Sequence, residues 1–298
     1  MIAMTIGLLI SLVMGTIFVG SSRAHAEDDR YARMIENGRF ALEQITTDLR
    51  MVSFWGEILD PGIITTALTA GQDCGIGILN GSNAILYNNP NSSPPTAQFD
   101  NTTGGCVALT GSVRAGTDQL AIKHTSGRAL TSGMVRGTGY LRSNGTAGSF
   151  IKDADSTAAP TGYADWQYLP SLYYIGDTGG VPRLCQLQLN GVAFGVTSSD
   201  QCLANGIEQL HVQFGIDTNG DGTADQYKSG PTAAEIANAL TARVYILVRS
   251  DTPDPLYKNN KSYQLGDLTV AGGGDGFYRR VFSSTIKLRN PSNLTVLK

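Results

Sequence analysis

The chain opens with an apolar segment that continues, without a turn signal, into an amphipathic helical pattern. Residues 1–22 contain no charged side chain, and about 20 helical residues are enough to cross the hydrocarbon core of a bilayer. No proline occurs before Pro61, so the pattern predicts one helix from Met1 to about Phe54, about 80 Å long at 1.5 Å per residue. Apolar or small residues then recur at steps of four and three, the spacing of one helical face; they are Tyr31, Ile35, Gly38, Leu42, Ile45, Leu49 and Val52.

The same segment has a second interpretation, as a secretory signal that is removed. Ala24-His25-Ala26 before Glu27 resembles an A-x-A cleavage site. However, no Lys or Arg precedes the apolar core, and this core is long for a signal peptide. We therefore favour a retained helix. The alternative is an exported, soluble, β-rich binding domain that is cleaved after Ala26.

After residue 56 the helical periodicity stops, and short apolar runs alternate with clusters of Gly, Asn, Ser and Pro, which predicts short strands joined by turns. Residues 207–216 predict a strand with one buried face, because Leu210, Val212, Phe214 and Ile216 recur in strict alternation. Residues 243–249 are apolar enough for a central strand. Residues 232–240 predict a short helix with Thr232 as its N-cap. The remaining predicted strands are 119–124, 168–175, 184–189, 192–196 and 281–288.

These elements predict an α+β fold with two parts. Residues 1–55 form the N-terminal helix, of which 1–22 are transmembrane and 23–55 amphipathic. Residues 56–298 form a globular head, in which the helix packs on an antiparallel β-sheet. We expect large loop insertions in roughly 60–200, where recognition of a partner is most easily carried.

Composition narrows the function classes. The 298 residues include 36 glycines and only 16% charged residues, which is typical of an exported β protein with many turns. The formal net charge is -3, so no overall basic field indicates nucleic-acid binding, and no specific nucleic-acid motif occurs. His25, His124 and His211 are isolated in the sequence, and no G-x-S-x-G or H-E-x-x-H motif is present. We therefore do not predict an enzyme; a calcium-dependent secreted enzyme is the weakest alternative.

Four cysteines occur, and none forms a Cys-x-x-Cys pair that would indicate zinc or thioredoxin-like chemistry. An even number in an exported chain favours disulfides. Of the three possible pairings we favour Cys74–Cys106 and Cys185–Cys202, because each closes a local loop between predicted strands. The chain-entropy model gives about 3–4 kcal/mol for loops of this size. The alternative is four free thiols in a reducing compartment.

Residues 217–225 read Asp-Thr-Asn-Gly-Asp-Gly-Thr-Ala-Asp, which matches the start of a calcium loop, with oxygen-bearing side chains at relative positions 1, 3, 5 and 9. Position 12 is Lys228 rather than Glu and the flanks look like strands, so the loop is not an EF-hand. The alternative is a plain Asn-Gly turn of a hairpin, although three aspartates would repel one another without a counter-ion. The expected Ca²⁺ ligands are the side chains of Asp217, Asn219, Asp221 and Asp225 and the carbonyl of Thr223.

Segments near both ends of the chain resemble one protein family. Residues 1–9 are similar to the part of a type IV prepilin that follows its Phe-Thr-Leu-Ile-Glu processing motif, which would lie upstream of Met1. Residues 36–42, ENGRFAL, and 48–51, DLRM, resemble the helix signature of the PilW family of minor pilins. Residues 217–225, 279–282 and 288–290 are also similar to that family, whereas roughly 60–200 are not covered. Either the natural chain begins further upstream, or its processing and assembly differ from those of the family.

The resemblance implies a pilin-like fold and a structural role as a minor pilin that is incorporated into a type IV pilus and primes or caps it. Its partners would be other pilin subunits, contacted through the N-terminal helix. Before assembly the helix would cross the inner membrane once, with the head in the periplasm; afterwards the subunit would be part of the extracellular pilus. Such pili support adhesion, motility and DNA uptake, so loops of the head would bind a host, a surface or DNA.

Overall fold

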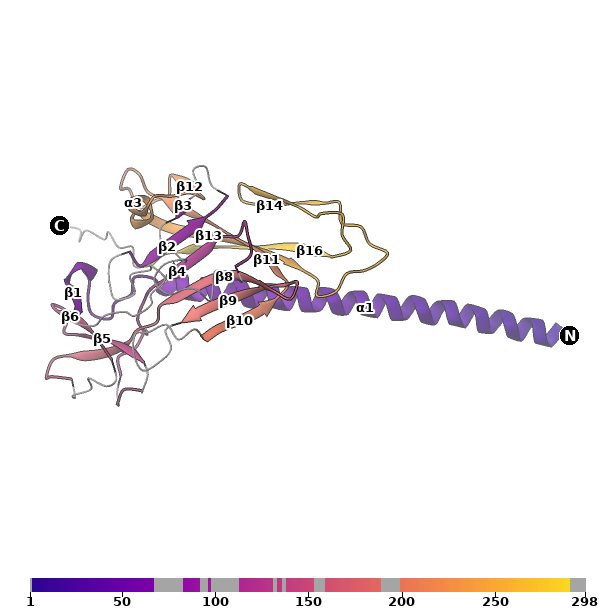
Figure 1. The fold of residues 1–298 in the computed structure, drawn as a ribbon, viewed down its shortest axis with the longest axis horizontal. Coiled ribbons are helices and arrows are strands. Elements are labelled where there is room, and N and C mark those ends of the chain that lie inside the picture. The colour runs from indigo at the N-terminus through magenta and orange to yellow at the C-terminus, as the bar shows by residue number, and fades with distance from the viewer. Residues whose placement is uncertain are drawn as a thin grey trace.

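A single helix, α1 (Ile2–Met51), projects far beyond the head of the protein (Figure 1). The structure is a computed structural model that describes residues 2–66, 83–91, 96–97, 113–130, 133–135, 138–152, 159–188 and 199–289. The predicted strand 192–196 and the predicted pair Cys74–Cys106 lie outside these residues. The continuous helix confirms the prediction made from the apolar and amphipathic patterns.

The end of α1 is set by a turn at Ser53. Its φ is 61°, in the left-handed region that residues other than glycine rarely adopt. The amide of Ser53 donates to the carbonyl oxygen of Lys123 at 3.2 Å, and the amide of Phe54 donates to that of Met51 at 3.0 Å. The helix therefore ends at Met51, short of the predicted end at Phe54, because a tertiary contact redirects the chain.

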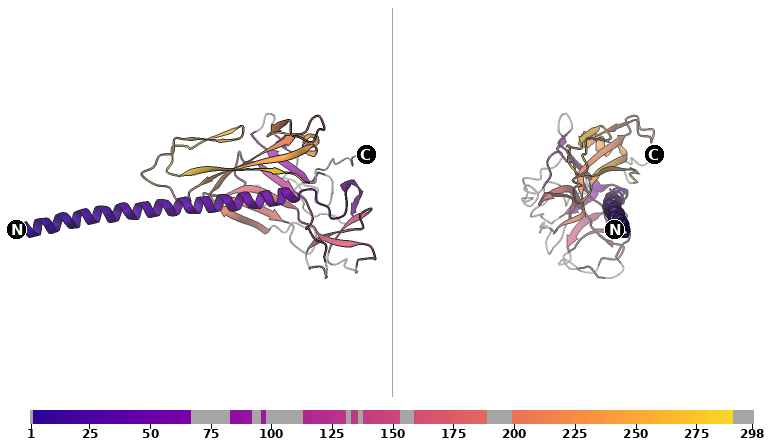
Figure 2. Two further views of the ribbon diagram at one scale, coloured as in Figure 1. Left: turned by 180° about the vertical axis from the view of Figure 1, so that it is seen from behind. Right: turned by 90° about the vertical axis from the view of Figure 1, so that its right-hand side faces the viewer.

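The two halves of α1 have different surroundings. Every described side chain from residue 2 to residue 26 is exposed. The second half contacts β10 (Ser199–Asn205), β13 (Ala239–Arg249) and β16 (Arg279–Lys287). Figure 2 shows this half running along the head while the first half stands free.

The buried face of α1 differs from the predicted face in its first turns. Met34 and Ala41 are buried, whereas the predicted Tyr31 is 37% exposed and Ile35 and Leu42 are only half-buried. An α-helix has 3.6 residues per turn, so a strict seven-residue repeat drifts around it. The predicted face is confirmed at residues 38, 45, 49 and 52, which are buried. At two positions the buried residue is one earlier than predicted, Met34 instead of Ile35 and Ala41 instead of Leu42.

Gly38 allows α1 to approach β16 closely. A Cβ atom at this position would lie 2.6 Å from Cε2 of Phe282, which is far inside van der Waals contact. Gly38 belongs to the helix signature and Phe282 to the C-terminal segment that suggested the same family. Two segments far apart in the sequence thus meet at one packing contact.

We expect Gly38→Ala to destabilise the head by about 1–3 kcal/mol, the usual cost of overpacking a core. This loss would outweigh the gain of about 1 kcal/mol in helix propensity. Urea unfolding of the full-length protein in detergent, followed by near-ultraviolet circular dichroism, measures the effect. Gly20→Ala is the matched control, because nothing lies within 4 Å of that position, and Phe282→Leu should partly restore the Gly38→Ala variant. Equal stability of Gly38→Ala and the wild type would contradict the contact.

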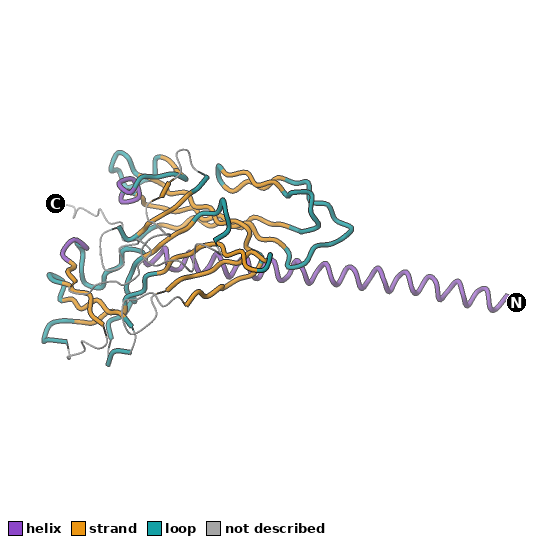
Figure 3. Tube along the Cα trace, viewed as in Figure 1, coloured by secondary structure: helices purple, strands orange, loops and turns teal. Residues whose placement is uncertain are grey.

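The head contains, in the described residues, four sheets rather than the single sheet that we predicted (Figure 3). All strand pairs are antiparallel except β1 with β6, which is parallel. The largest sheet has six strands in the order β10-β9-β8-β4-β2-β3. Besides β10, its strands are β2 (Ile85–Asn89), β3 (Thr96–Ala97), β4 (Gln119–Ile122), β8 (Ser171–Thr178) and β9 (Val181–Gln188).

The sheet that carries the end of the chain has the order β12-β11-β13-β16, with β11 at Ile207–Ile216 and β12 at Gln226–Lys228. A hairpin of β14 (Ser262–Leu265) and β15 (Leu268–Ala271) accompanies it. The remaining sheet, β1-β6-β5-β7, is formed by β1 (Ile64–Thr66), β5 (Gly139–Ser143), β6 (Gly148–Lys152) and β7 (Ala164–Gln167). A short 3-10 helix, Pro61–Ile63, precedes β1.

Most predicted strands are confirmed with shifted ends. The strand predicted at 243–249 forms part of β13 and is central, between β11 and β16. The short helix is α3 (Ala233–Ala237), where Thr232 accepts from the amide of Glu235 in a capping box. The one-sided burial predicted for β11 is wrong, because all ten of its residues are buried. Its polar face is covered by other elements, as described below.

The core lies where the second half of α1 meets the sheets. Ile45 and Leu49 of the helix are fully buried, as are Val212 of β11 and Val244 of β13. A second, aromatic group attaches the β1-β6-β5-β7 sheet; it consists of Trp55, Phe150 and Tyr168, with ring centroids 4.6–6.3 Å apart. Burial of such rings supplies much of the free energy of folding.

Candidate functional site

The first half of α1 is an extended apolar surface. Its large apolar side chains between Ile2 and Val19 are 50–82% exposed. By length and composition α1 could cross a membrane, and none of its most apolar window of 18 residues is buried against the head. A helix that is apolar on all sides requires an apolar environment. This surface therefore fits a bilayer or other apolar helices.

The predicted signal-peptide cleavage site lies inside α1. Ala24 and Ala26 belong to the unbroken helix Ile2–Met51, and both are exposed. No turn or strand separates the apolar half from the half that packs on the head. Retention of this helix, rather than its removal after Ala26, stays a prediction.

The predicted calcium loop connects β11 to β12 and is exposed. Both carboxylate oxygens of Asp217 accept backbone amides, Oδ1 from Gly220 at 2.6 Å and Oδ2 from Gly222 at 2.9 Å. Oδ1 of Asp221 accepts the amide of Thr223 at 2.8 Å. These bonds close the loop as a series of tight turns, as a hairpin connection would.

The carboxylates of Asp221 and Asp225 share one neighbour, the side-chain amide of Asn219. Its Nδ2 donates to Oδ2 of Asp221 at 3.1 Å and to Oδ1 of Asp225 at 3.4 Å. Hydrogen bonds from Thr223 lower the pKa of Asp221, and those from Thr218 lower the pKa of Asp225. Both carboxylates are thus charged at neutral pH.

The oxygen donors of this loop suit a hard cation such as Ca²⁺, but they are not gathered around one point. Across the described part of the chain, no group of three or more His, Cys, Asp or Glu side chains could hold a metal ion. Asn219 would have to turn its carbonyl oxygen inward to complete a cage. Calcium binding by Asp217, Asn219, Asp221, Thr223 and Asp225 therefore stays a prediction.

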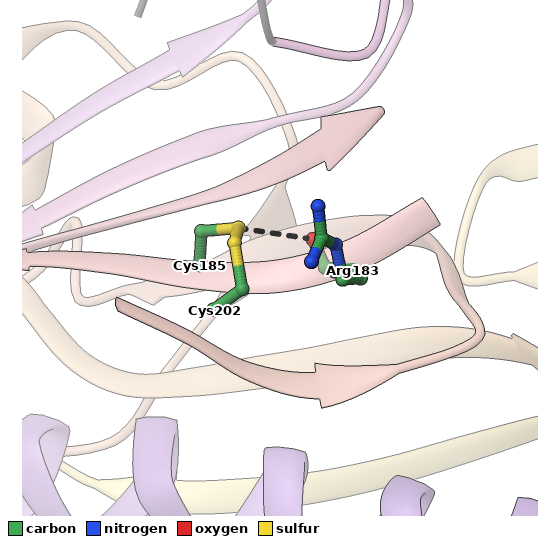
Figure 4. The surroundings of a disulfide bond; sticks show 3 residues. All are labelled: Arg183, Cys185 and Cys202. Atoms are coloured by element: carbon green, nitrogen blue, oxygen red, sulfur yellow. Dashed lines mark hydrogen bonds between the residues drawn. A yellow bond between two sulfur atoms is a disulfide. The ribbon is translucent and has the colours of Figure 1, made fainter. Parts of the chain in front are cut away.

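The disulfide predicted between Cys185 and Cys202 is confirmed (Figure 4). The two residues are directly paired across β9 and β10, and their sulfur atoms are 2.01 Å apart. Cys185 is buried and Cys202 is exposed. The bond ties β10, at the edge of its sheet, to a strand of the interior.

A polar cluster that the sequence did not predict joins three parts of the head; its members His211 and Asp118 are buried, whereas Asp267 is exposed. Nδ1 of His211 lies 2.9 Å from Oδ2 of Asp118, and Nε2 lies 2.8 Å from Oδ1 of Asp267. His211 is on β11, Asp118 precedes β4, and Asp267 is in the turn of the β14–β15 hairpin. Both ring nitrogens face carboxylates, an arrangement in which a protonated imidazole donates both bonds.

Asp118 also completes the open edge of β11. Its amide donates to the carbonyl oxygen of Leu210 at 3.2 Å, and its Oδ2 accepts the amide of Val212 at 3.0 Å. The hydroxyl of Tyr87, on β2, faces two acceptors, Oδ2 of Asp118 and the carbonyl oxygen of Val212, which share its single proton. The cluster thereby fastens the six-stranded sheet to the edge of β11 and explains why the polar face of β11 is buried.

The titration of this cluster follows from its geometry. Burial alone would lower the pKa of His211, but the hydrogen bonds and charges of Asp118 and Asp267 raise it above its usual value. Burial opposes ionisation of Asp267, yet hydrogen bonds from Ser229 and His211 lower its pKa. Burial raises the pKa of Asp118 despite the bonds that it accepts from His211 and Tyr87.

We expect the head to lose stability as the pH rises through the raised pKa of His211. The stabilisation from the imidazolium is complete below its unfolded pKa of about 6.5 and is lost above the folded value. The contribution of Asp267 is present above its unfolded pKa of about 3.9 and is lost as the pH falls through its lowered folded pKa. Stability should therefore peak between these limits, with an alkaline loss of about 1.5–3 kcal/mol, the size of a hydrogen bond to a charged group.

Urea unfolding of the full-length protein in detergent from pH 4 to pH 9 would measure this profile. His211→Gln should remove the alkaline loss, and His25→Gln, on the exposed helix, should leave it in place. An unchanged profile in His211→Gln would show that the cluster does not control the pH dependence.

A second buried cluster, also missed from the sequence, is ionic. Arg279 of β16 contacts Glu208 of β11 through Nε at 2.5 Å and Nη2 at 2.9 Å. It also contacts Asp275 through Nη1 and Nη2, each at 2.6 Å. The side chains of Arg279 and Glu208 are only 6% and 7% exposed. The interruption of the apolar pattern of β11 by Glu208 is the one sequence signal that could have indicated such a pair.

The free-standing apolar helix, its packed continuation and the antiparallel sheets together define an α+β protein in which one long helix projects from a β-rich head. The family model of PilW, described as type IV pilus-assembly protein W, matches residues 172–290. The match runs from β8 to the end of β16 and includes the C-terminal segments that resemble this family. The match begins at residue 172, whereas the resemblance seen in the sequence left roughly 60–200 without a counterpart in the family.

A solved structure of a type IV-like pilin from Thermus thermophilus is similar, with a TM-score of 0.35 and 10% sequence identity. The similarity covers 87% of this chain and 98% of that chain. No curated protein sequence matches this chain.

Proposed function

We propose that this chain is a structural minor pilin that is incorporated into a type IV pilus. One observation carries the proposal: a single helix has a free apolar half and a half that forms the core of the head. A soluble binding domain has no use for the free half, whereas a filament subunit needs it twice, in the membrane and then against other subunits. The PilW match over 172–290 supports the same role.

The exposed half of α1 would be the contact surface for other pilin subunits. Gly7, Gly15 and Gly20 have no atoms within 4 Å of the position of a Cβ, so neighbouring helices could approach there, as small residues permit in membranes. Before assembly this half would cross the inner membrane and the head would lie in the periplasm. In the pilus, the subunit would prime or cap the filament, and loops of the head would serve adhesion, motility or DNA uptake.

The mature N-terminus tests this proposal most directly. Mass spectrometry of the natural protein from membrane and sheared-pilus fractions should find residues 2–26 retained, with a methylated phenylalanine upstream of Met1. Deletion of the gene should reduce the number of pili if the subunit primes assembly. A terminus at Glu27 would instead establish the exported binding domain.

We also propose that the loop at 217–225 binds Ca²⁺. The proposal is supported by the oxygen donors of the loop. It is also supported by the charged carboxylates of Asp221 and Asp225, which both accept hydrogen bonds from the side-chain amide of Asn219. Calcium should raise the melting temperature of the full-length protein in detergent, and a chelator should reverse the rise, because a ligand that binds only the folded state stabilises it. Asp217→Ala with Asp221→Ala should abolish the response, whereas Asp251→Ala, an exposed aspartate of another loop, should not. An equal response in both variants would refute the site.

A further inference from the structure

The part of the head that reaches furthest along α1 toward its N-terminus is formed by the segments on either side of the β14–β15 hairpin (Figure 1). These segments, 250–261 and 272–278, lie beside the helix at Arg30 and Tyr31, about two turns beyond the end of the uncharged stretch at Ser22. Nη1 of Arg30 is 3.7 Å from Oδ2 of Asp254. The ring of Tyr31 is 5.0 Å from that of Tyr278.

The tip of the first segment, residues 254–258, is held in a fixed shape. The amide of Asp254 donates to the carbonyl oxygen of Gly276 at 2.8 Å, and the hydroxyl of Tyr278 donates to Oδ2 of Asp254 at 3.0 Å. The ring of Tyr257 stacks on that of Tyr278 at 4.3 Å. Oδ1 of Asp254 accepts the amide of Leu256 at 2.9 Å. These bonds set the direction in which Leu256 projects.

Leu256 is 79% exposed at this tip. Single exposed leucines are common and need no explanation by themselves, but three features set this one apart. It projects from a rigid turn, it is followed by Tyr257 and the exposed Lys258, and its loop is paired with the helix near the end of the apolar segment. Apolar, aromatic and lysine side chains together are typical of the boundary between lipid and water.

The level of the tip along α1 agrees with that boundary. Hydrogen bonds from Leu256 and Tyr278 lower the pKa of Asp254, and the charges of Arg30 and Arg23 lower it further. Arg23 directly follows the uncharged segment, and Arg30 lies about 12 Å beyond Ser22 at 1.5 Å per residue. Asp254 is thus charged and paired with Arg30, and the other exposed charged side chains of the segment are Asp251 before Leu256 and Lys258 and Lys261 after it.

We propose that residues 254–258 form a second membrane contact, in which Leu256 and Tyr257 enter the headgroup region of the bilayer that holds α1. The occupant is lipid, because the tip lies at the end of the head from which the apolar half of α1 emerges, and so faces the bilayer that would hold this half. The contact would fix the tilt and rotation of the head before assembly, which a single helix passing through a bilayer cannot do. This inference rests on the proposed membrane anchoring of α1.

Quenching by brominated lipids tests the contact. The full-length protein is reconstituted at high lipid-to-protein ratio in phosphatidylcholine–phosphatidylglycerol vesicles, with bromine placed near the headgroup end of the acyl chains. Leu256→Trp should lose about half of its added emission, because a residue that enters the interface lies about 5–10 Å deep at the acyl boundary. The emission of the wild type, from Trp55 and Trp166 in the head, is the baseline.

Two further variants separate the possible failures. Leu59→Trp is the matched control, since Leu59 is 88% exposed but lies beyond the other end of α1; it should not be quenched. Ile10→Trp, within the apolar half, reports insertion of the helix. If Ile10→Trp is not quenched, the membrane anchoring itself fails and this inference falls with it.

If Ile10→Trp is quenched but Leu256→Trp behaves like Leu59→Trp, anchoring stands and the second contact is overturned. A blue-shifted Leu256→Trp emission without quenching would also overturn it, because a protein surface rather than lipid would then cover the tip.

Discussion

Replacing Arg279 by methionine is expected to lower the free energy of unfolding of the head by about 3–5 kcal/mol, the usual cost of breaking a buried ion pair. The guanidinium lies between Glu208 and Asp275. It donates two hydrogen bonds to each carboxylate, from Nε and Nη2 to Glu208 and from Nη1 and Nη2 to Asp275. Without it, the carboxylate of Glu208 would stay buried with only longer contacts, from Arg249 at 3.5 Å and from Arg114 at 4.0 Å. The uncompensated charge, rather than the lost bonds, dominates the expected loss.

The neighbouring residue provides a control for this prediction. Arg280→Met changes the same residue type on the same strand, but Arg280 is exposed and only covers the ring of Phe282, 5.5 Å away. Its substitution should cost about 1 kcal/mol or less. Arg279→Lys should lose less than Arg279→Met, because an ammonium keeps the compensating charge although it cannot reproduce the planar fork that meets two carboxylates. Urea unfolding of the full-length protein in detergent measures all three; equal losses in the Arg279→Met and Arg280→Met variants would contradict the assignment.

Removing the disulfide by Cys185→Ala together with Cys202→Ala should cost about 2–4 kcal/mol. The bond spans 17 residues of sequence, and in the chain-entropy model it restricts the unfolded chain. It also holds β10, the edge strand that contacts α1, onto β9. We therefore expect the double substitution to accelerate amide hydrogen exchange, relative to the wild type, more in β10 and the adjoining part of α1 than in β11 or β13.

A reducing agent distinguishes this bond from other cysteine effects. Reduction should destabilise the wild type by a similar amount and should have a smaller effect on the double variant. If the double variant is as stable as the oxidised wild type, the bond contributes to neither stability nor the attachment of β10.

The helix and most strands could be predicted because their signals are local. A run of uncharged residues, a helical spacing and an alternating strand all depend on neighbours within a few positions. The N-cap of α3 was readable for the same reason, since Thr232 and Glu235 are three residues apart. The pair Cys185–Cys202 was also accessible, because it joins adjacent strands.

The polar clusters could not be predicted, because their members are distant in sequence. His211 and Asp118 are 93 residues apart, and Arg279 and Glu208 are 71 apart. No periodicity links such residues. The alternating pattern of β11 even indicated a solvent-facing side, since Gln209, His211 and Gln213 are polar; in the structure the β14–β15 turn and the segment before β4 cover them. The calcium loop shows the reverse case, a local pattern whose oxygen donors the structure does not gather.

The sequence by itself determined that this protein has a membrane-length apolar helix continuous with an amphipathic one, followed by a head of short strands. Hydrophobic spacing determines these features, because it specifies which faces of each element avoid water. Only the tertiary structure decided which face of α1 is buried at Met34 and Ala41, where the helix turns away at Ser53, and which charges meet inside the head. Those features depend on contacts between segments far apart in the chain, and their free energy exists only once the sheets are assembled.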